Sequence, residues 1–368
     1  MTSILLANLW RRPGRTAFTA LGIALGVATI VALLSLGEGL KQTAGGLIHL
    51  GDADFAVFQH GVEDPTASFL PSSIVGRVSR VNGVASATPI MLLVETIKPQ
   101  PGSIVFGTTP KGSMSDRLVM LSGRRVTKPG EVAVGDLLAK QMHLGLGGTL
   151  KVGPRKLKIV GTYHVGQFFV DAGAVVDLRQ AQGIVQRPGE ITTVAVQVAA
   201  QAHTKSVRKA VAGTLPGTDV ISNPEEAARA GANGELVHKT VLLLVAVALI
   251  IGGIGVTNTM AMAVLERARE LALMSAVGWS PRQVGGLVLL EGVAVSILGA
   301  GIGLLLGALG AGGLTDALGV SNVVKPEVTA WSMGRGLIIG IAIGVLGGLY
   351  PAWRVSRLPA EELLARGA

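Results

Sequence analysis

The sequence lacks cysteine altogether and is poor in charge. Without cysteine, the chain has no disulfide framework, no thiolate nucleophile and no cysteine-ligated metal. Charged residues make up 15% of the 368 residues, whereas soluble domains carry about 25%. The mean hydropathy is +0.54. This shortage of charge argues against an ordinary soluble protein and indicates a chain that contacts lipid.

Several catalytic motifs are missing as well. The sequence has no H-E-x-x-H pair and no G-x-S-x-G, and GSIVFGTT (Gly102–Thr109) lacks the lysine that must follow the glycines of a phosphate loop. The six histidines show no metal-ligand spacing; they are His49, His60, His143, His164, His203 and His238. The sequence therefore predicts no catalytic, metal or cofactor site in this chain. Any ATP and Mg²⁺ that the system uses would be bound by another polypeptide.

Positive charge and glycine are in excess. The net charge of +9 is compatible with nucleic-acid binding, but basic residues that flank membrane spans on the cytoplasmic side explain it better in so apolar a chain. We therefore expect no nucleic-acid partner. Glycine accounts for 52 residues, against a usual ~7% of a sequence. It is concentrated in the apolar runs, as close packing of membrane helices requires.

Four long uncharged runs are candidates for membrane spans, because a spanning helix needs about 20 apolar residues. They are Thr16–Gly37, Thr240–Leu265, Gly292–Thr315 and Gly336–Trp353. We place the first span with a short interfacial helix, Ile4–Trp10, in residues 1–37. The other spans are residues 239–265, 283–315 and 335–353. The first span has a basic flank like a signal peptide, but its apolar run is too long and no small-x-small cleavage site follows, so it is expected to be a retained anchor.

The arginines flanking these spans predict the orientation. They lie before the first span, between the second and third, and after the fourth, which are three segments on the same side of a four-span protein; the arginines are Arg11, Arg12, Arg15, Arg267, Arg269, Arg282, Arg354, Arg357 and Arg366. The positive-inside rule makes that side cytoplasmic. Both termini, with the tail 354–368, are therefore expected inside the bacterial cytoplasmic membrane, and residues 316–334 form an outer loop.

Residues 38–238 are long enough for a folded extracytoplasmic domain. The segments with strand patterns are DFAVFQHG, ASATPIMLLVETI, SIVFGTT, ITTVAVQVAA and TDVIS, and those with helical spacing are SSIVGRVSRVNGV and HTKSVRKAVAGTL. They predict an α+β fold, with an α/β part at 38–120 and 187–222. Residues 121–186 have short strands separated by glycine and proline turns, which predicts an inserted small β-rich subdomain. A helix beginning with Asn223 as N-cap and Pro224 at the first position would form a stalk, 223–238, that leads into the second span.

The polar stretch between the second and third spans, 266–282, is built more heavily than a turn. If helix continues from Val264 to Val277, Glu266 pairs with Arg269 and Arg267 with Glu270. Leu273 and Val277 then line an apolar face, with Leu271, Met274 and Ala276 nearby. Gly278 suits a helix stop, and Ser280-Pro281-Arg282-Gln283 is a capping box that starts the next helix. This predicts a rigid helix–stop–helix device, although an ordinary inside loop with topology arginines is the alternative.

Glycines recur four residues apart on three of the spans. The ladders are Gly22/Gly26, Gly299/Gly303/Gly307 and Gly336/Gly340/Gly344/Gly348. Such spacing lets helix backbones approach closely. A ladder could mark a dimer seam, or it could serve packing within the chain.

ERARELALMSAVGWSPRQV (266–284) resembles the cytoplasmic signature of the FtsX/MacB-like family of ABC transporter permeases, the type VII or mechanotransmission group. The ending YPAWRVSRLPAEELLA resembles that family's C-terminal motif. GEVAVGDLLAKQMHLGLGGTLKVGPRKLKIVGTY resembles the small periplasmic subdomain of MacB-type members. The implied fold is a membrane α-helical protein with four transmembrane helices and a large extracytoplasmic α+β domain. Leu271 and Leu273 depart from the usual isoleucines of the signature.

The resemblance also implies partners and site residues. It implies a homodimeric permease in membrane lipid, with two copies of a separate ABC ATPase, and it makes an envelope adaptor a candidate partner. By position, the ATPase-coupling residues would be Glu266, Arg267, Arg269, Glu270, Ala276, Gly278, Trp279, Arg354, Arg357 and Glu361, the last within a second contact that reaches Leu364. Arg267 and Arg269 could instead serve topology alone.

Three hypotheses for function remain. The first is a permease that couples ATP hydrolysis by its partner to movement of the outside domain and exports or extracts a lipophilic, peptide or lipoprotein substrate. The second is a transmembrane signal relay that activates an envelope partner such as a cell-wall hydrolase. The third is a membrane-anchored sensor that needs no nucleotide, against which the rigid hairpin argues.

Overall fold

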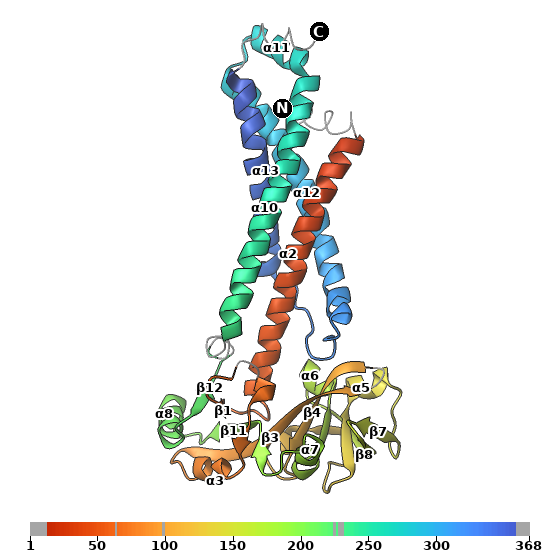
Figure 1. The fold of residues 1–368 in the computed structure, drawn as a ribbon, viewed down its shortest axis with the longest axis vertical. Coiled ribbons are helices and arrows are strands. Elements are labelled where there is room, and N and C mark those ends of the chain that lie inside the picture. Colours follow the sequence, from red (N-terminus) through yellow and green to blue (C-terminus); the bar gives the residue numbers. More distant parts are fainter. Residues whose placement is uncertain (1–12, 63–64, 98–99, 224–225, 227–231, 358–368) are drawn as a thin grey trace. The chain divides into compact units, whose positions relative to one another are not determined.

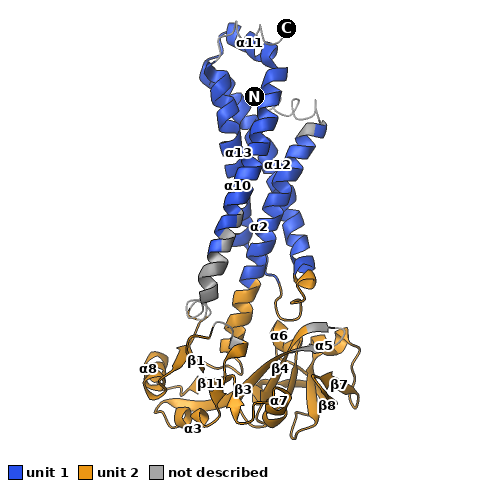
Figure 2. Ribbon diagram, in the orientation of Figure 1, with its two compact units in different colours: residues 1–38, 238–314, 326–368 blue, residues 39–237, 315–325 orange. Residues whose placement is uncertain are grey.

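A computed structural model describes residues 13–62, 65–97, 100–223, 226 and 232–357 of this chain. The chain divides into two compact units, shown in different colours in Figure 2. Unit 1 comprises Met1–Glu38, His238–Leu314 and Pro326–Ala368, and unit 2 comprises Gly39–Val237 and Thr315–Lys325. The expected interfacial helix Ile4–Trp10 and the tail beyond residue 357 lie outside the described residues.

Unit 1 is helical. Its long helices are α2 (Pro13–Ile48), α10 (Ala232–Glu266), α12 (Pro281–Ala317) and α13 (Ala330–Arg357), and the short α11 (Ala268–Ala276) joins α10 to α12 (Figure 1). By length and composition, four of the described helices could cross a membrane. Each expected span lies within one of them. The helices continue past the uncharged runs, so that α2 extends beyond residue 37, α10 takes in part of the expected stalk, and α12 starts at Pro281.

Small residues bring α12 against α2. A Cβ atom added at Gly303 would lie 2.6 Å from the carbonyl oxygen of Ala24, and Gly299 and Gly307 meet the carbonyls of Ala20 and Ala28 at 2.7 and 2.8 Å. No real side chain could be accommodated at these distances without moving a backbone. The ladder on α12 therefore serves helix packing within this chain, which is the second of the two readings of its spacing.

The ladder on α13 also packs within unit 1. A Cβ at Gly336 would meet Val31 of α2, and one at Gly340 or Gly344 would meet Ala300 or Ser296 of α12. The first-span ladder differs. No described atom lies within 4 Å of a Cβ built at Gly22, and one at Gly26 would have only ordinary contact, 3.8 Å from Ala248. Gly22 thus lies on an open face of α2, and a dimer contact through this ladder stays a prediction.

Apolar side chains fill the remaining space between these helices. The central cluster consists of Ala20, Ile23, Val27, Val31, Val256, Met260, Val295, Ala300 and Ile343. They come from α2, α10, α12 and α13, so the four helices share one core. Thr19 and Thr259 add a hydroxyl–hydroxyl contact of 2.7 Å between α2 and α10. The described interior between these helices is therefore largely apolar and closely packed.

Unit 2 is an α+β domain. Its strands are β1 (Phe55–Gln59), β2 (Leu70–Pro71), β3 (Val84–Ile97), β4 (Gln100–Thr108), β5 (Val119–Gly123), β6 (Glu131–Gly135), β7 (Thr149–Val152), β8 (Arg155–His164), β9 (Ala174–Asp177), β10 (Glu190–Ile191), β11 (Thr193–Val198) and β12 (Thr218–Ile221). Its helical segments are η1 (Pro65–Ala67), α3 (Ile74–Ser79), α4 (Ser113–Arg117), α5 (Asp136–Gln141), α6 (Phe168–Asp171), α7 (Leu178–Ile184) and α8 (Thr204–Thr214).

Ten strands form one mixed sheet in the order β12-β1-β11-β3-β4-β9-β6-β8-β5, with β7 paired to β8. A small second sheet pairs β10 with β2. The segment 121–186, expected as an inserted subdomain, contributes β6 to β9 to the large sheet, which it joins through the parallel pairing of β9 with β4. The segment 121–186 is therefore continuous with the α/β part through main-chain hydrogen bonds.

Both faces of this sheet are buried, and the side chains alternate between them as strand geometry requires. Met91, Leu93 and Val105 pack on one side with Leu138 and Ile184 of α5 and α7. The intervening residues pack on the other side; they are Ile90, Leu92, Ile104, Phe106 and Ala133, with Leu47 from the end of α2 and Phe169 of α6. The alternation explains why β3 and β4 read as continuous apolar runs in the sequence.

The local predictions for unit 2 agree with the structure. The strands expected from DFAVFQHG, ASATPIMLLVETI, SIVFGTT, ITTVAVQVAA and TDVIS are β1, β3, β4, β10–β11 and β12, and the two expected helices are α3 and α8. Asn223 acts as an N-cap, because its Oδ1 accepts a hydrogen bond from the backbone N–H of Glu226 at 2.8 Å. Pro224 lies outside the described residues.

Candidate coupling hairpin

The hairpin between α10 and α12 begins with a break in the helix. Arg267 has φ −113° and ψ 19°, so α10 ends at Glu266 and α11 starts at Ala268. The expectation of one continuous helix from Val264 to Val277 is therefore wrong at this residue. At this bend the Arg267 side chain reaches both Glu270 of α11 and Glu291 of α12.

The end of α11 is as the sequence predicts. Gly278 has φ +104°, which side chains disfavour, and the N–H of Trp279 donates to the carbonyl of Met274 at 3.0 Å. Ser280 and Gln283 form the expected reciprocal capping box, with Ser280 N–H donating to Gln283 Oε1 at 2.7 Å and Gln283 N–H to Ser280 Oγ at 3.4 Å. Pro281 is the first residue of α12. The helix–stop–helix prediction is thus confirmed.

One side of α11 is buried against the other helices of unit 1. Ala268, Leu271 and Ala272 are each at most 2% exposed. Leu271 belongs to a cluster with residues of α10, α12 and α13, namely Val264, Val284, Val288, Ala352 and Val355, against which Met274, Trp279 and Leu289 also pack. This cluster brings the hairpin and the last turns of α13 together, so the two predicted contact regions are neighbours in space.

The opposite side of α11 is exposed. Arg269, Leu273, Ala276 and Val277 lie there, with Leu273 61% and Val277 83% exposed. Their spacing of four, three and one residues places them on one helical face, which we call the outer face of α11. Two large apolar side chains at the end of a bundle, beside a charged residue and beyond the hydrophobic helices, are typical of a protein–protein contact.

Arg267 is held inside the hairpin. Its Nε donates to Glu270 at 3.1 Å and its Nη1 to Glu291 of α12 at 2.9 Å. The side chains of Arg267 and Glu291 are only 18% and 10% exposed. The predicted pairing of Arg267 with Glu270 is therefore present, whereas the partner on α12 was not predicted. A signal for it existed, because Glu291 is the only charged residue in the expected span 283–315.

The remaining predicted residues lie around the same end of unit 1. Glu266 and Gly278 are exposed, and Trp279 is half-buried against the inner cluster. On α13, the guanidinium of Arg357 stacks over Trp353 at 4.4 Å and Arg354 donates to the Tyr350 hydroxyl at 3.2 Å. Glu361 lies outside the described residues. The described members thus gather at the ends of α10, α12 and α13 (Figure 1).

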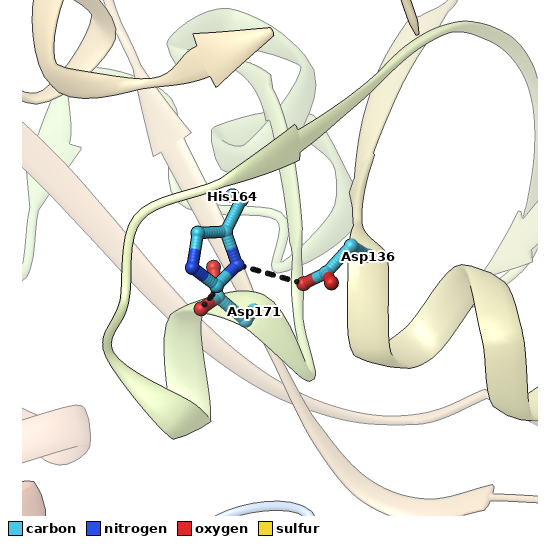
Figure 3. A group of neighbouring side chains, drawn as sticks. All are labelled: Asp136, His164 and Asp171. Atoms are coloured by element: carbon cyan, nitrogen blue, oxygen red, sulfur yellow. Dashed lines mark hydrogen bonds and ion pairs between the residues drawn. The ribbon is translucent and has the colours of Figure 1, made fainter. Parts of the chain in front are cut away.

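Unit 2 contains a polar cluster that the sequence did not predict, formed by Asp136, His164 and Asp171 (Figure 3). Nδ1 of His164 lies 3.1 Å from Asp136 and 3.2 Å from Asp171. Asp171 also accepts the backbone N–H groups of Val165 and Gly166 at 2.7 and 2.9 Å. The three residues come from α5, β8 and α6, so their spacing along the chain has no motif.

The charges in this cluster compensate one another. The hydrogen bond with Asp136 and the charge of Asp171 raise the pKa of His164 above its ordinary value of 6.5. Burial raises the pKa of Asp171. Burial also opposes ionisation of Asp136, but hydrogen bonds from Lys140 and His164 outweigh it and hold the pKa of that carboxyl low. These contacts between His164 and the two carboxyl groups tie α5, β8 and α6 together.

Comparison with known proteins places both units in one family. The family described as MacB-like periplasmic core domain matches residues 16–214, and the FtsX-like permease C-terminal family matches residues 242–360. The macrolide export ATP-binding/permease protein MacB of Nitrobacter winogradskyi is 26% identical over 390 residues, covering 98% of this chain and 59% of the relative. The chain therefore spans less than two thirds of that longer protein.

Two further matches are with YknZ, one over nearly the full length of this permease and one with the crystal structure of its extracellular domain. The uncharacterized ABC transporter permease YknZ of Bacillus subtilis is 23% identical over 397 residues, covering 98% of this chain and 97% of YknZ. The crystal structure of the extracellular domain of YknZ is 16% identical with a TM-score of 0.37, covering 45% of this chain and 98% of that domain. With the first family matching more than half of its residues and the second most of the rest, the chain belongs to the MacB/FtsX-like family of ABC transporter permeases.

Proposed function

We propose that this permease binds a separately encoded ABC ATPase through the outer face of α11, and that ATP-driven movement of the ATPase is passed through unit 1 to unit 2. Membership of the family implies an ABC ATPase partner. The observation that carries the proposal is the two-sided α11. Its inner side is fixed to three other helices by Leu271, while its outer side offers Leu273 and Val277 to a partner.

The size of the exposed contact supports a specific partner. Complete burial of a leucine or valine side chain stabilises a contact by ~1.5–3 kcal/mol. Leu273 and Val277 are more than half exposed. A partner that covers both side chains would therefore gain most of this free energy for each of them. Arg269 on the same face adds a charge that a carboxylate on the ATPase could pair. A nine-residue helix is too short to cross a bilayer by itself.

The charge distribution supports a cytoplasmic position for this contact. Arg267, Arg269 and Arg282 belong to the hairpin, and Arg354 and Arg357 to the last turn of α13. Cytoplasmic ends of membrane helices carry such an excess of arginine. Both termini are then cytoplasmic and unit 2 is extracytoplasmic, as the periplasmic core-domain match also suggests.

The packing of unit 1 supports mechanical transmission rather than a channel through the chain. Its described core consists of alanine, valine, isoleucine and methionine, with glycines in backbone contact. Close-packed interiors transmit displacement because they deform little. In addition, α2 is one unbroken helix that contributes residues to both units. We propose that a homodimer in membrane lipid, bound to two ATPase copies and an envelope adaptor, uses this movement to export or extract a lipophilic, peptide or lipoprotein substrate.

The proposal is tested by substitution on the outer face of α11. Val277→Asp and Leu273→Asp should each weaken binding of the tagged permease to its ABC ATPase at least tenfold, since ~1.4 kcal/mol corresponds to a factor of ten. The ATPase is identified in the purified complex by its Walker A sequence, and affinity is then measured in lipid nanodiscs. Val119→Asp is the matched control, because Val119 is 61% exposed on β5 of unit 2. Unchanged affinity of both α11 variants would refute the assignment.

Substrate-stimulated ATP turnover separates transport from the signal-relay hypothesis. Candidate macrolides, lipopeptides and acylated peptides are added to the reconstituted complex, and the rate of phosphate release is recorded. Stimulation by one class, abolished by Val277→Asp, supports transport of that class. A complex that responds only to an added cell-wall hydrolase supports relay instead.

A further inference from the structure

The ion pair between Arg267 and Glu291 lies where the hairpin meets α12. We infer that this pair is the mechanical connection between the coupling hairpin and the third membrane helix, so that Arg267 and Glu291 are positioning residues rather than ATPase contacts. The inference rests on the proposed function and names the route by which the movement enters the membrane helices. It reassigns Arg267, which the family signature alone places with the contact residues.

The burial of the pair separates it from the outer face of α11. The Arg267 side chain is 18% exposed and that of Glu291 is 10% exposed, whereas Val277 is 83% exposed. Apolar side chains surround the two charged groups, namely Met260, Ala263, Val264, Leu271 and Val288. An ATPase docked on α11 would therefore meet the outer face and leave this pair within the permease.

The apolar surroundings strengthen the attraction between Arg267 and Glu291. In such an environment the attraction between opposite charges is several times stronger than in water. Removing one partner of a buried pair leaves the other charge uncompensated, which is strongly destabilising, whereas exchange of the two charges preserves the attraction. The ion pair therefore fixes the position of Arg267 relative to Glu291, whereas the apolar contacts beside it would allow α11 and α12 to slide past each other.

The two sides of the contact are in register. Glu291 and Val288 are three residues apart on α12, so they lie on one helical face. Leu271 lies one turn into α11, and its N–H donates to the Arg267 carbonyl at 3.0 Å. All four residues line the same small cavity. Leu271 packs with Val288 in the inner cluster, and the ion pair fixes which turn of α12 lies opposite the break in the helix at Arg267. Glu270 accepts from the same guanidinium at 3.1 Å, which holds α11 to the pair as well.

The contacts of Arg267 give a route by which a movement of the hairpin reaches the membrane helices. A displacement of α11 pulls on the guanidinium through Glu270 and through the backbone, and the guanidinium pulls on α12 through Glu291. Because the backbone of α12 packs against the backbone carbonyls of α2 at Gly299, Gly303 and Gly307, the displacement continues into the first helix. Loss of the ion pair should therefore uncouple ATP binding from movement of unit 2 without removing the ATPase.

The experiment measures binding and movement separately in the assembled complex. The chain contains no cysteine, so a single Val119→Cys substitution allows a spin label to be placed on unit 2 alone. In nanodiscs containing the permease and its ATPase, the distance between labels on the two proposed copies is measured by pulsed electron paramagnetic resonance with ATP and with ADP. ATPase affinity is measured on the same preparations. The variants are Glu291→Gln, Arg267→Gln and the exchange Arg267→Glu/Glu291→Arg. The exchange also carries Glu270→Gln, because Glu270 would otherwise face a second carboxylate at position 267.

We expect each single variant to bind the ATPase within about threefold of the unsubstituted permease, well under the tenfold step that ~1.4 kcal/mol represents. The ATP-dependent change in distance should be lost in both single variants and recovered in the exchange variant. A variant that merely fails to fold would lose ATPase affinity as well, and recovery in the exchange variant distinguishes the two cases.

Other results overturn the inference in different ways. Single variants that keep the full ATP-dependent change show that the pair carries no movement, and the proposed function then stands without it. If the single variants lose ATPase affinity tenfold but keep their melting temperature, Arg267 belongs to the contact with the ATPase after all. If the unsubstituted complex binds ATPase but shows no change with ATP, the proposed function itself fails.

Discussion

Replacing Gly303 of α12 by leucine is expected to destabilise unit 1 far more than replacing Gly22 of α2 by leucine. A Cβ at Gly303 would lie 2.6 Å from the Ala24 carbonyl oxygen and 2.8 Å from the Val27 Cβ, whereas one at Gly22 meets no described atom within 4 Å. Both neighbours of Gly303 are fixed to the backbone of α2 and cannot rotate away. The two helices would have to separate along the whole ladder.

The magnitude follows from overpacking. Extra carbon atoms in a well-packed core cost about 1–3 kcal/mol and occasionally more, and separation of α12 from α2 also loosens the contacts at Gly299 and Gly307. We expect Gly303→Leu to lose ~3 kcal/mol, which for a domain of this size corresponds to a fall in melting temperature of roughly 6–12 °C. The gain in helix propensity on replacing glycine is the same at both sites, so it cancels in the comparison with Gly22→Leu.

The assay is thermal unfolding of the purified permease in detergent, followed by loss of the monodisperse peak on size exclusion. Gly22→Leu should melt within about 2 °C of the unsubstituted chain, since a surface substitution changes stability by no more than ~0.5 kcal/mol. Equal melting temperatures for the two variants would refute the intrachain packing of α12 on α2. A larger loss at Gly22 would show that the open face of α2 is the tighter interface.

Three further predictions concern single residues outside the membrane helices' core. His164→Gln should reduce the pH dependence of unit 2 stability in chemical denaturation: the raised pKa of His164 adds stability that is complete below pH 6.5 and is lost as pH rises through that raised pKa. Glu131→Gln should lower the free energy of unfolding by ~2 kcal/mol at pH 7. The hydrogen bond from Arg124 holds the pKa of Glu131 at about 2, so this difference is complete above pH 4.5, decreases as pH falls and disappears only below that pKa. Gly278→Val should cost ~1–3 kcal/mol of strain because φ is +104°, seen as a lower melting temperature in the complex, whereas equal melting would show that the turn accepts side chains.

Elements of strong periodicity could be predicted from the sequence. The membrane helices follow from uncharged length, and β3, β4 and β11 follow from runs of branched residues that are buried on both faces of one sheet. Their long-range pairing could not be predicted. The parallel pairing of β4 with β9 joins residues about 70 positions apart, Val105 with Ala174, and no local pattern encodes such a register.

The candidate site was predictable to the extent that local chemistry encodes it. Gly278 and the Ser280–Gln283 capping box are local signals, and the structure has both. The break at Arg267 was not predictable, because the residue is a good helix former and its partner Glu291 lies 24 positions away along the chain. The role of the α12 ladder likewise depends on which helix faces it, a tertiary fact that glycine spacing leaves open.

The most direct test of the central claim is crosslinking from the outer face of α11. In inverted membrane vesicles containing the permease and its ABC ATPase, a single Val277→Cys substitution carrying a short photoreactive group is illuminated, and crosslinked products are identified by mass spectrometry. Val119→Cys in the same vesicles is the control. We predict a crosslink from position 277 to a polypeptide with a Walker A sequence and none from position 119. Labelling of position 119 but not 277 from the outside of these vesicles, or a crosslink from 277 to lipid alone, would contradict the account.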